Sequence, residues 1–316
     1  MVSEHNHGHD HAHAPTNFNR AFAVGIALNV LFVVVEAFYG WKVNSLALLA
    51  DAAHNLSDVA GLVLAWGGAL ASQLKPDARH TYGWQRGTIM AALINAILLL
   101  LAMGSLGWEA VQRLQTQEAT EGWTVIGVAA VGIVVNTVTA LLFMKDRKDD
   151  LNIRGAFLHM AADALVSVGV VLGGVLYLWQ GWAWIDPVMS LLIAAVIVVG
   201  TWSLFHQSLH MMFDGVPLNL DLHQVHGCLM ALPGVVAVHD LHVWAMSTSQ
   251  VALTAHLVVA DASTDSGILL ANAQEELDEH FQIQHVTLQV ETAEHARHCA
   301  LRTHGSDLSA DTPGTP

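Results

Sequence analysis

Residues 48–62, LLADAAHNLSDVAGL, place Asp51, His54, Asn55 and Asp58 inside an apolar run. A helix in water could turn these side chains to the solvent, but a helix in lipid cannot. A charged side chain at the centre of a bilayer costs at least ~2.5 kcal/mol on insertion scales. The interpretation of this stretch therefore depends on whether the chain spans a membrane.

The composition is typical of a membrane protein. Of the 316 residues, 53% are hydrophobic and only 12% are charged, and the mean hydropathy is +0.46. An average soluble chain is about 25% charged. A spanning helix needs roughly 20 mainly apolar residues. Six runs reach that length, at about 21–41, 46–74, 85–112, 122–144, 153–180 and 184–205. The sequence therefore predicts an α-helical membrane protein with six transmembrane helices.

The distribution of lysine and arginine predicts the orientation of these helices. Short cytoplasmic loops carry an excess of basic residues. We therefore expect both termini in the cytoplasm. The segment before the first run lacks the basic region and cleavage pattern of a secretory signal, so we expect it to be retained. Eight basic residues flank one side and two flank the other: Arg20, Lys75, Arg79, Arg86, Lys145, Arg147, Lys148 and Arg154 against Lys42 and Arg113.

The composition changes after about Met212. Residues 213–316 hold two basic and thirteen acidic residues, a balance of −11 within a whole-chain net charge of −15. Nucleic acid is therefore not an expected partner, because its binding needs a positive surface. The order αββαβ predicts a small cytoplasmic α+β domain, ferredoxin- or metallochaperone-like. Periodicity predicts its elements as a helix in 220–234, strands in 235–246 and 250–260, a helix in 266–281 and a strand in 284–291.

These features divide the chain into four segments. We expect a His-rich flexible segment at 1–19, a six-helix transmembrane domain at 20–212 and the cytoplasmic α+β domain at 213–293. Residues 294–316 are rich in Ser, Thr, Asp, Pro and Gly, which predicts a disordered tail. Cys228 and Cys299 lie on the cytoplasmic side, where reduced thiols are expected.

The second and fifth runs share a His-x-x-x-Asp pattern. His54 precedes Asp58 by four residues, and His159 precedes Asp163 by the same spacing. Residues four apart lie on one face of a helix. Two such helices facing each other offer two imidazole nitrogens and two carboxylates, which is a tetrahedral ligand set suited to Zn²⁺. The alternative is that each polar side chain only bonds a neighbouring helix, but two copies of one pattern favour a metal site.

Other polar residues in the apolar runs have no such twin. For these residues we expect hydrogen bonds between helices, or a water-filled vestibule, rather than metal ligation. They are Asn29, Glu36, Asp51, Asn95 and Asn136.

Several motifs together resemble the cation diffusion facilitator family. They are SLALLADAAHNLSD (45–58), RHTYGWQR (79–86), LNIRGAFLHMAADAL (151–165) and VHDLHVWA (238–245), and the similarity extends from about Phe18 to Glu291. The resemblance implies a homodimeric, proton-coupled exporter of divalent metal, and it implies that His54, Asp58, His159 and Asp163 form the transport site. The two histidines resemble zinc-type members more than manganese or iron members, with Cd²⁺, Co²⁺ and Ni²⁺ as further candidate substrates. We expect a multi-pass protein of the bacterial cytoplasmic (inner) membrane.

The resemblance also implies two further metal sites. In the loop between the second and third helices, Asp77 and His80 match family ligands, but Trp84 stands where a third His can occur, and an ordinary solvated loop is the alternative. In the cytoplasmic domain the matching ligands are His239, His256, Gln289 and Glu291. No cofactor is expected, because zinc is the transported substrate and, at these positions, a candidate regulatory ligand.

Three other functional interpretations remain open at this point. The N-terminal HNHGHDHAH, with five histidines at alternate positions, is typical of a weak metal-gathering arm or of an expression tag. The motif HQSLH, with His206 and His210, resembles one histidine box of membrane di-iron oxygenases, but a second box is missing. A membrane-tethered metal sensor would use the same transport site without moving the ion. No GxxxxGK[ST] motif is present, so protons rather than ATP are the expected energy source.

Overall fold

The computed structural model describes residues 20–72, 75–116, 120–144, 151–261 and 264–298, except for the side chains of 20–26, 62, 64–72, 142–144, 151–159 and 298. The His-rich segment 1–19 and most of the predicted disordered tail therefore lie outside the described residues. The chain forms two compact units, residues 1–59 with 101–197 and residues 60–100 with 198–316, and each is described by itself.

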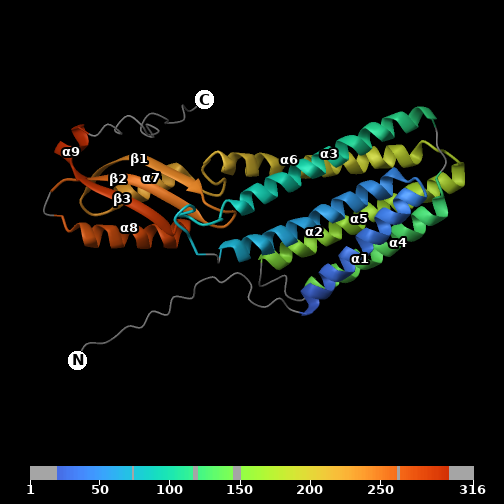
Figure 1. Ribbon diagram of the computed structural model, residues 1–316, viewed down its shortest axis with the longest axis horizontal. Helices are drawn as coiled ribbons and strands as arrows, with labels where there is room; N and C mark the ends of the chain where they lie inside the picture. The colour runs from blue at the N-terminus through green and yellow to red at the C-terminus, as the bar shows by residue number, and fades with distance from the viewer. Residues whose placement is uncertain (1–19, 73–74, 117–119, 145–150, 262–263, 299–316) are drawn as a thin grey trace. The chain divides into compact units, whose positions relative to one another are not determined.

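Six long helices come first in the chain (Figure 1): α1 (Arg20–Lys42), α2 (Leu46–Ser72), α3 (Gly87–Thr116), α4 (Gly122–Met144), α5 (Leu151–Gln180) and α6 (Ile185–Met212). Among the described residues, four of them are long and apolar enough to cross a membrane: α3, α6, Gly122–Leu141 of α4 and Met160–Gln180 of α5. Large apolar side chains such as Leu101, Leu165 and Val199 are exposed, which fits a surface covered by lipid. The predicted fold class, a transmembrane helical region followed by a small α+β domain, is confirmed.

Glycines allow α4 to approach its neighbours closely. A Cβ added at Gly132 would lie 2.6 Å from the Phe32 ring of α1 and 3.2 Å from Ser167 Oγ of α5. A Cβ at Gly174 of α5 would lie 2.7 Å from Ile126 of α4. Small residues at helix contacts let backbones pack tightly where no hydrophobic effect drives association. These glycines therefore set the spacing of α1, α4 and α5.

We expect Gly132→Leu to destabilise the transmembrane region by about 1–3 kcal/mol, the usual cost of overpacking. Phe32 is 3% exposed and has little room to move away. Thermal unfolding of the purified protein in detergent measures the effect. Gly127→Leu, on the same helix, is the matched control, because a Cβ added at Gly127 would have no neighbouring atom within 4 Å. Equal unfolding temperatures for the two variants would contradict this account of the packing.

Buried polar contacts connect the start of α2 to the start of α6, and the turn before α2 to α3. Asp186, at the start of α6, accepts hydrogen bonds from Ser45 Oγ (2.6 Å) and from the backbone N–H of Leu46 (2.9 Å), which opens α2. A carboxylate at a helix N-terminus satisfies N–H groups that have no partner within the helix. Arg113 of α3 donates to the carbonyl and side-chain oxygens of Asn44, at 2.6 and 2.7 Å. These contacts hold the starts of α2 and α6 together.

The cytoplasmic domain consists of α7 (Leu222–Ala231), β1 (Val235–Ala245), β2 (Val251–Val259), α8 (Ser266–Phe281), β3 (His285–Thr292) and α9 (Ala293–His298) (Figure 1). The sheet order is β1-β2-β3, with β1 antiparallel and β3 parallel to β2. Asp221 and Asp265 begin α7 and α8 by accepting backbone N–H groups of the first turn. The predicted αββαβ order is thus present.

One face of the sheet packs on α7 and α8. The core includes Leu253, Ala255 and Leu257 of β2 together with Leu229 of α7 and Leu277 of α8. Because side chains alternate along a strand, His256 lies on the opposite face of β2. The register pairs His256 with His239 of β1 and with Gln289 of β3. The core thus leaves a second face on which polar side chains gather.

The predicted disordered tail, 294–316, begins too early. Helix α9 covers Ala293–His298, and the backbone N–H of His295 donates to Thr292 Oγ1 at 3.4 Å. A hydroxyl at the residue before a helix caps its first turn. The prediction of disorder rested on the polar composition of the segment and did not take this cap into account. Residues 299–316 lie outside the described part of the chain.

Candidate metal sites

Two helices bring three of the predicted transport-site residues together. His54 and Asp58 come from α2, and Asp163 comes from α5. One ligand atom of each lies within 4.8 Å of the others. His54 Nε2 lies 3.4 Å from Asp163 Oδ1 and 3.7 Å from Asp58 Oδ2. Side chains that are 109 residues apart in the sequence therefore form one polar group between two apolar helices.

These spacings fit a small tetrahedral ion. Four ligand atoms about 2.1 Å from a zinc ion, at the corners of a tetrahedron, lie about 3.4 Å from one another. The two His54 distances are close to that value. Asp163 is buried, whereas the side chains of His54 and Asp58 are 20% and 26% exposed. The group is therefore not fully enclosed.

His159, the fourth predicted ligand, belongs to α5, but its side chain lies outside the described residues. It precedes Asp163 by four residues. One helical turn therefore separates the two positions along α5.

The group of His54, Asp58 and Asp163, called the transport group after its predicted role, has polar neighbours that the His-x-x-x-Asp motif itself does not contain. Asn55 Nδ2 donates to Glu36 Oε2 at 3.2 Å, linking α2 to α1. Ser167 Oγ donates to Asp51 Oδ2 at 3.2 Å, linking α5 to α2. Glu36, Asp51 and Ser167 are fully buried. The contact of Ser167 with Asp51 was not predicted from the sequence, because a single serine in an apolar helix shows no periodic pattern.

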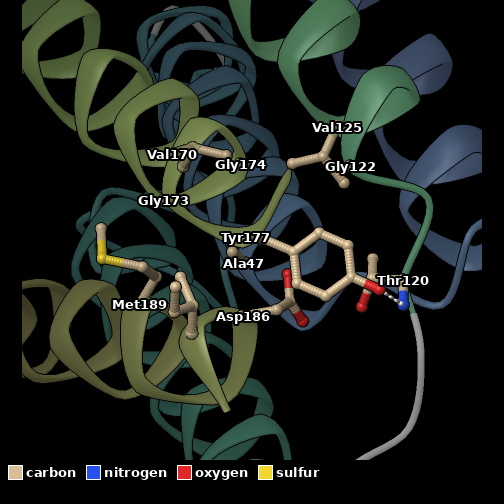
Figure 2. A pocket seen from close by; sticks show the side chains of 11 residues that line it. Ala47, Thr120, Gly122, Val125, Val170, Gly173, Gly174, Tyr177, Asp186 and Met189 are labelled. Atoms are coloured by element: carbon tan, nitrogen blue, oxygen red, sulfur yellow. Dashed lines mark hydrogen bonds between the residues drawn. The ribbon is translucent and has the colours of Figure 1, made fainter. Parts of the chain in front are cut away.

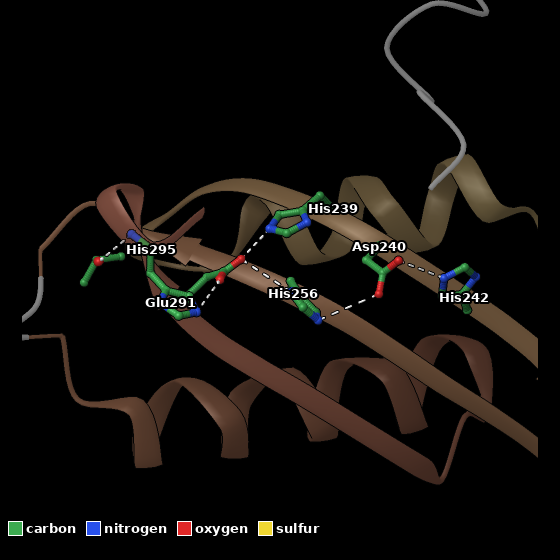
Figure 3. Close-up of polar contacts among 7 residues, drawn as sticks. His239, Asp240, His242, His256, Glu291 and His295 are labelled. Carbon is green, nitrogen blue, oxygen red and sulfur yellow. Dashed lines mark hydrogen bonds and ion pairs between the residues drawn. The ribbon is translucent and has the colours of Figure 1, made fainter. Parts of the chain in front are cut away.

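A second group lies on the open face of the cytoplasmic sheet (Figure 3). His239, His256 and Glu291 each offer a ligand atom within 4.8 Å of the others. Glu291 Oε1 contacts His239 Nε2 and lies 3.5 Å from His256 Nδ1. Gln289 is exposed and lies opposite His256 in the register of β2 and β3. The four predicted residues therefore share one face of the sheet.

Two neighbours of this group were missed from the sequence. Asp240 Oδ2 lies 3.8 Å from His256 Nε2, and His295 Nε2 lies 3.7 Å from Glu291 Oε2 (Figure 3). Asp240 has a φ of 51° at an irregularity of β1, which allows it to join the side of the strand that carries His239. Glu291 belongs to β3 and His295 to α9, so no single strand or helix period relates the two residues.

The loop after α2 contains a smaller polar contact. Asp77 Oδ1 accepts the backbone N–H groups of His80 and Arg79 at 2.6 and 2.7 Å, and its other oxygen lies 3.3 Å from His80 Nδ1. The N–H groups of His80 and Arg79 hold the pKa of the Asp77 carboxyl below its usual range. The His80 ring lies 4.3 Å from the Trp84 ring. Among the described residues, no third His, Cys, Asp or Glu joins this pair, so a metal site there stays a prediction.

A small cavity elsewhere in the transmembrane region has Asp186 as the single carboxylate, histidine or cysteine among the described residues that line it (Figure 2). It encloses about 20 Å³, and Tyr177, Asp186 and Met189 are among the side chains that line it. Asp186 already accepts hydrogen bonds from Ser45 and Leu46. The cavity has room for about one water molecule. Within the part of the chain that the structure describes, the two clusters of histidine and carboxylate are therefore the metal-site candidates.

Comparison with protein families identifies both parts of the chain. Residues 22–213 match the model of the cation efflux transmembrane domain, and residues 217–293 match that of the cation efflux cytoplasmic domain. The chain belongs to the cation efflux family. The resemblance to cation diffusion facilitators is thereby confirmed.

Three curated members of the cation efflux family show the extent of the similarity. The metal cation efflux system protein CzcD of Cupriavidus metallidurans is 34% identical over 293 residues, 93% of this chain and 91% of that one. The zinc transporter ZitB of Escherichia coli is 34% identical over 294 residues, 92% and 93% of the two chains. The cadmium, cobalt and zinc/H(+)-K(+) antiporter of Bacillus subtilis is 35% identical over 268 residues, 84% and 86% of the two chains.

As a cation efflux protein, the chain is an integral membrane transporter of metal cations and not an enzyme. The di-iron interpretation of His206 and His210 is therefore excluded. His210 instead has a local structural contact, because its Nε2 lies 2.9 Å from the carbonyl oxygen of Val216. This contact joins the end of α6 to the segment that leads into α7.

Proposed function

We propose that this cation efflux protein exports Zn²⁺ from the cytoplasm in exchange for protons. The proposal is carried by the group of His54, Asp58 and Asp163, whose spacings match the edges of a zinc tetrahedron. His159 is the proposed fourth ligand. Imidazole suits zinc, whereas manganese sites are richer in oxygen. Cd²⁺ and Co²⁺ are further candidates, as the name of the cadmium, cobalt and zinc antiporter suggests. Ni²⁺ is another, because imidazole ligands also suit nickel.

Proton exchange follows from the chemistry of the proposed ligands. An imidazole must be neutral to bind a metal, and its ordinary pKa of about 6.5 lies close to the pH of the cytoplasm. Metal binding therefore expels protons, and protonation weakens metal binding. If the site opens to each side in turn, the more acidic outer side protonates the histidines and releases the ion. On the cytoplasmic side the same histidines lose protons and bind the next ion.

The remaining parts of the proposal concern location and assembly. We place the protein in the bacterial cytoplasmic membrane with both termini in the cytoplasm, as the eight-to-two distribution of basic residues indicates. In this proposal residues 20–212 transport the ion and residues 213–293 form a regulatory domain. Residues 1–19 are a metal-gathering arm, and residues 294–316 are a tail. The model that matches residues 217–293 is named for dimers, which supports a homodimer. A mass measurement in detergent that finds only monomers would refute it.

The experiment that tests the transport mechanism uses proteoliposomes with opposed gradients. An imposed pH gradient should drive Zn²⁺ across the membrane, and a Zn²⁺ gradient should move protons the opposite way. Empty liposomes, and liposomes with the His54→Ala variant, are the controls. Zinc flux that does not depend on the pH gradient would contradict proton exchange and indicate a channel or a uniporter instead. Zinc binding without any flux would leave a membrane-tethered sensor.

We expect His54→Asp to reduce the preference for Zn²⁺ over Mn²⁺. The change replaces a borderline nitrogen ligand with a hard oxygen ligand, which suits manganese better. Competition between the two metals in the flux assay measures the preference. His223→Asp, at an exposed position of α7, is the matched control. An unaltered Zn²⁺/Mn²⁺ ratio in His54→Asp would argue against His54 as a ligand.

A further inference from the structure

Two buried carboxyl groups lie beside the transport group without belonging to its ligand set. Glu36 of α1 and Asp51 of α2 are each 0% exposed, and negative charges on both carboxyl groups would repel each other. An ionised carboxylate only accepts hydrogen bonds. Two neighbouring carboxyl groups can therefore hydrogen-bond to each other only while one of them carries a proton.

Few hydrogen-bond donors surround the pair, so a second negative charge is poorly stabilised there. Asn55 donates to Glu36 Oε2 and Ser167 donates to Asp51 Oδ2. The other oxygens, Glu36 Oε1 and Asp51 Oδ1, accept no hydrogen bond from the described residues. Two adjacent carboxylates in an apolar site repel each other and lose their hydration, so one of them takes up a proton.

The charged groups that face the pair come from the transport group. Asp51 interacts electrostatically with His54 on its own helix and with Asp163 on α5. Helix α4, which packs on α1 and α5, has no charged residue in its sequence. The electrostatic environment of the pair therefore depends on what occupies the transport group.

We propose that Glu36 and Asp51 together hold one proton while the transport group is empty, and release it when a divalent cation binds there. This inference rests on the proposed exchange of Zn²⁺ for protons and adds a proton site apart from the metal ligands. The O–H bond of the protonated carboxyl breaks, its proton passes to water, and the pair then consists of two ionised carboxylates. A nearby double positive charge stabilises the second negative charge, since Coulomb interactions are strong at low effective dielectric.

The fold connects this pair directly to the helices that carry the ligands. Asp51 lies three residues before His54, and Ser167 lies four residues after Asp163. The Ser167–Asp51 hydrogen bond therefore joins the pair to α5 one helical turn from Asp163. Binding of an ion between α2 and α5 is thus communicated to the pair by a short path.

The test counts protons released for each Zn²⁺ bound by the purified full chain in weakly buffered detergent solution near pH 7. Glu36→Gln and Asp51→Asn should each release about one proton fewer per ion than the unaltered protein, while still binding Zn²⁺. In either variant the remaining carboxyl has no carboxyl partner with which to share a proton. Asp186→Asn is the matched control, a buried carboxyl outside the pair, and should release the unaltered number.

A second measurement guards against variants that fail to fold. Infrared difference spectra of the unaltered protein should show that Zn²⁺ binding removes the carbonyl stretch of a protonated carboxylic acid. Variants that bind Zn²⁺ and release the unaltered number of protons would overturn the inference, as would the absence of that infrared change. The proposed function fails separately, if zinc flux through the unaltered protein ignores the pH gradient.

Discussion

Replacing Asp163 by alanine should abolish zinc transport while leaving membrane insertion intact. Asp163 is buried, and its Oδ1 lies 3.4 Å from His54 Nε2 between α2 and α5. A tetrahedral ion that loses one ligand is poorly held. Changes to residues that only orient metal ligands already cost about 10–100-fold in affinity, so we expect a loss beyond 100-fold. Zinc uptake into proteoliposomes and equilibrium binding measure the two effects.

Leu165→Ala is the matched control for Asp163→Ala. Leu165 lies two residues further along α5, and its side chain is 72% exposed. Both variants remove side-chain atoms from one helix, but only Asp163→Ala removes a proposed ligand. Full transport by Asp163→Ala would show that the cluster of His54, Asp58 and Asp163 is a packing feature rather than the transport site.

The second large effect is expected in the cytoplasmic domain. Changing His239, His256 and Glu291 together to alanine should remove one tightly bound zinc ion per chain. The three side chains offer ligand atoms within 4.8 Å of one another, and histidine nitrogens and carboxylate oxygens both bind zinc in proteins. Zinc binding is counted by calorimetry on the full chain carrying Asp163→Ala, so that the transport group does not contribute.

A second histidine–glutamate pair in the same domain provides the control for this count. His280 Nε2 lies 3.3 Å from Glu276 Oε2 on α8, and both side chains are well exposed. Changing that pair to alanine should leave the number of bound ions unaltered. If the triple variant binds as many ions as the control, the group on the open face of the sheet is only a set of ion pairs.

Much of the fold was predictable because it depends on local patterns. Apolar length alone located the six helices, and the 2-residue and 3.6-residue periods located the strands and helices of the cytoplasmic domain. The repeated His-x-x-x-Asp spacing selected His54, Asp58 and Asp163 because residues four apart share a helix face. The end of that domain was not predicted, since the six-residue helix α9 has too few residues to show a period.

The sequence by itself determined which residues could bind a metal and on which elements they lie. Only the tertiary structure decided how far apart they are, because that depends on how α2 meets α5 and how β2 meets its neighbours. The same packing joins Glu36 to Asp51, brings Ser167 to Asp51, and carries Asp240 and His295 to the edge of the cytoplasmic group. Each of these contacts links different elements, and that of Asp240 also relies on a local irregularity of the backbone. Spacing along the chain contains no information about such contacts, since they arise from the packing of whole helices and strands.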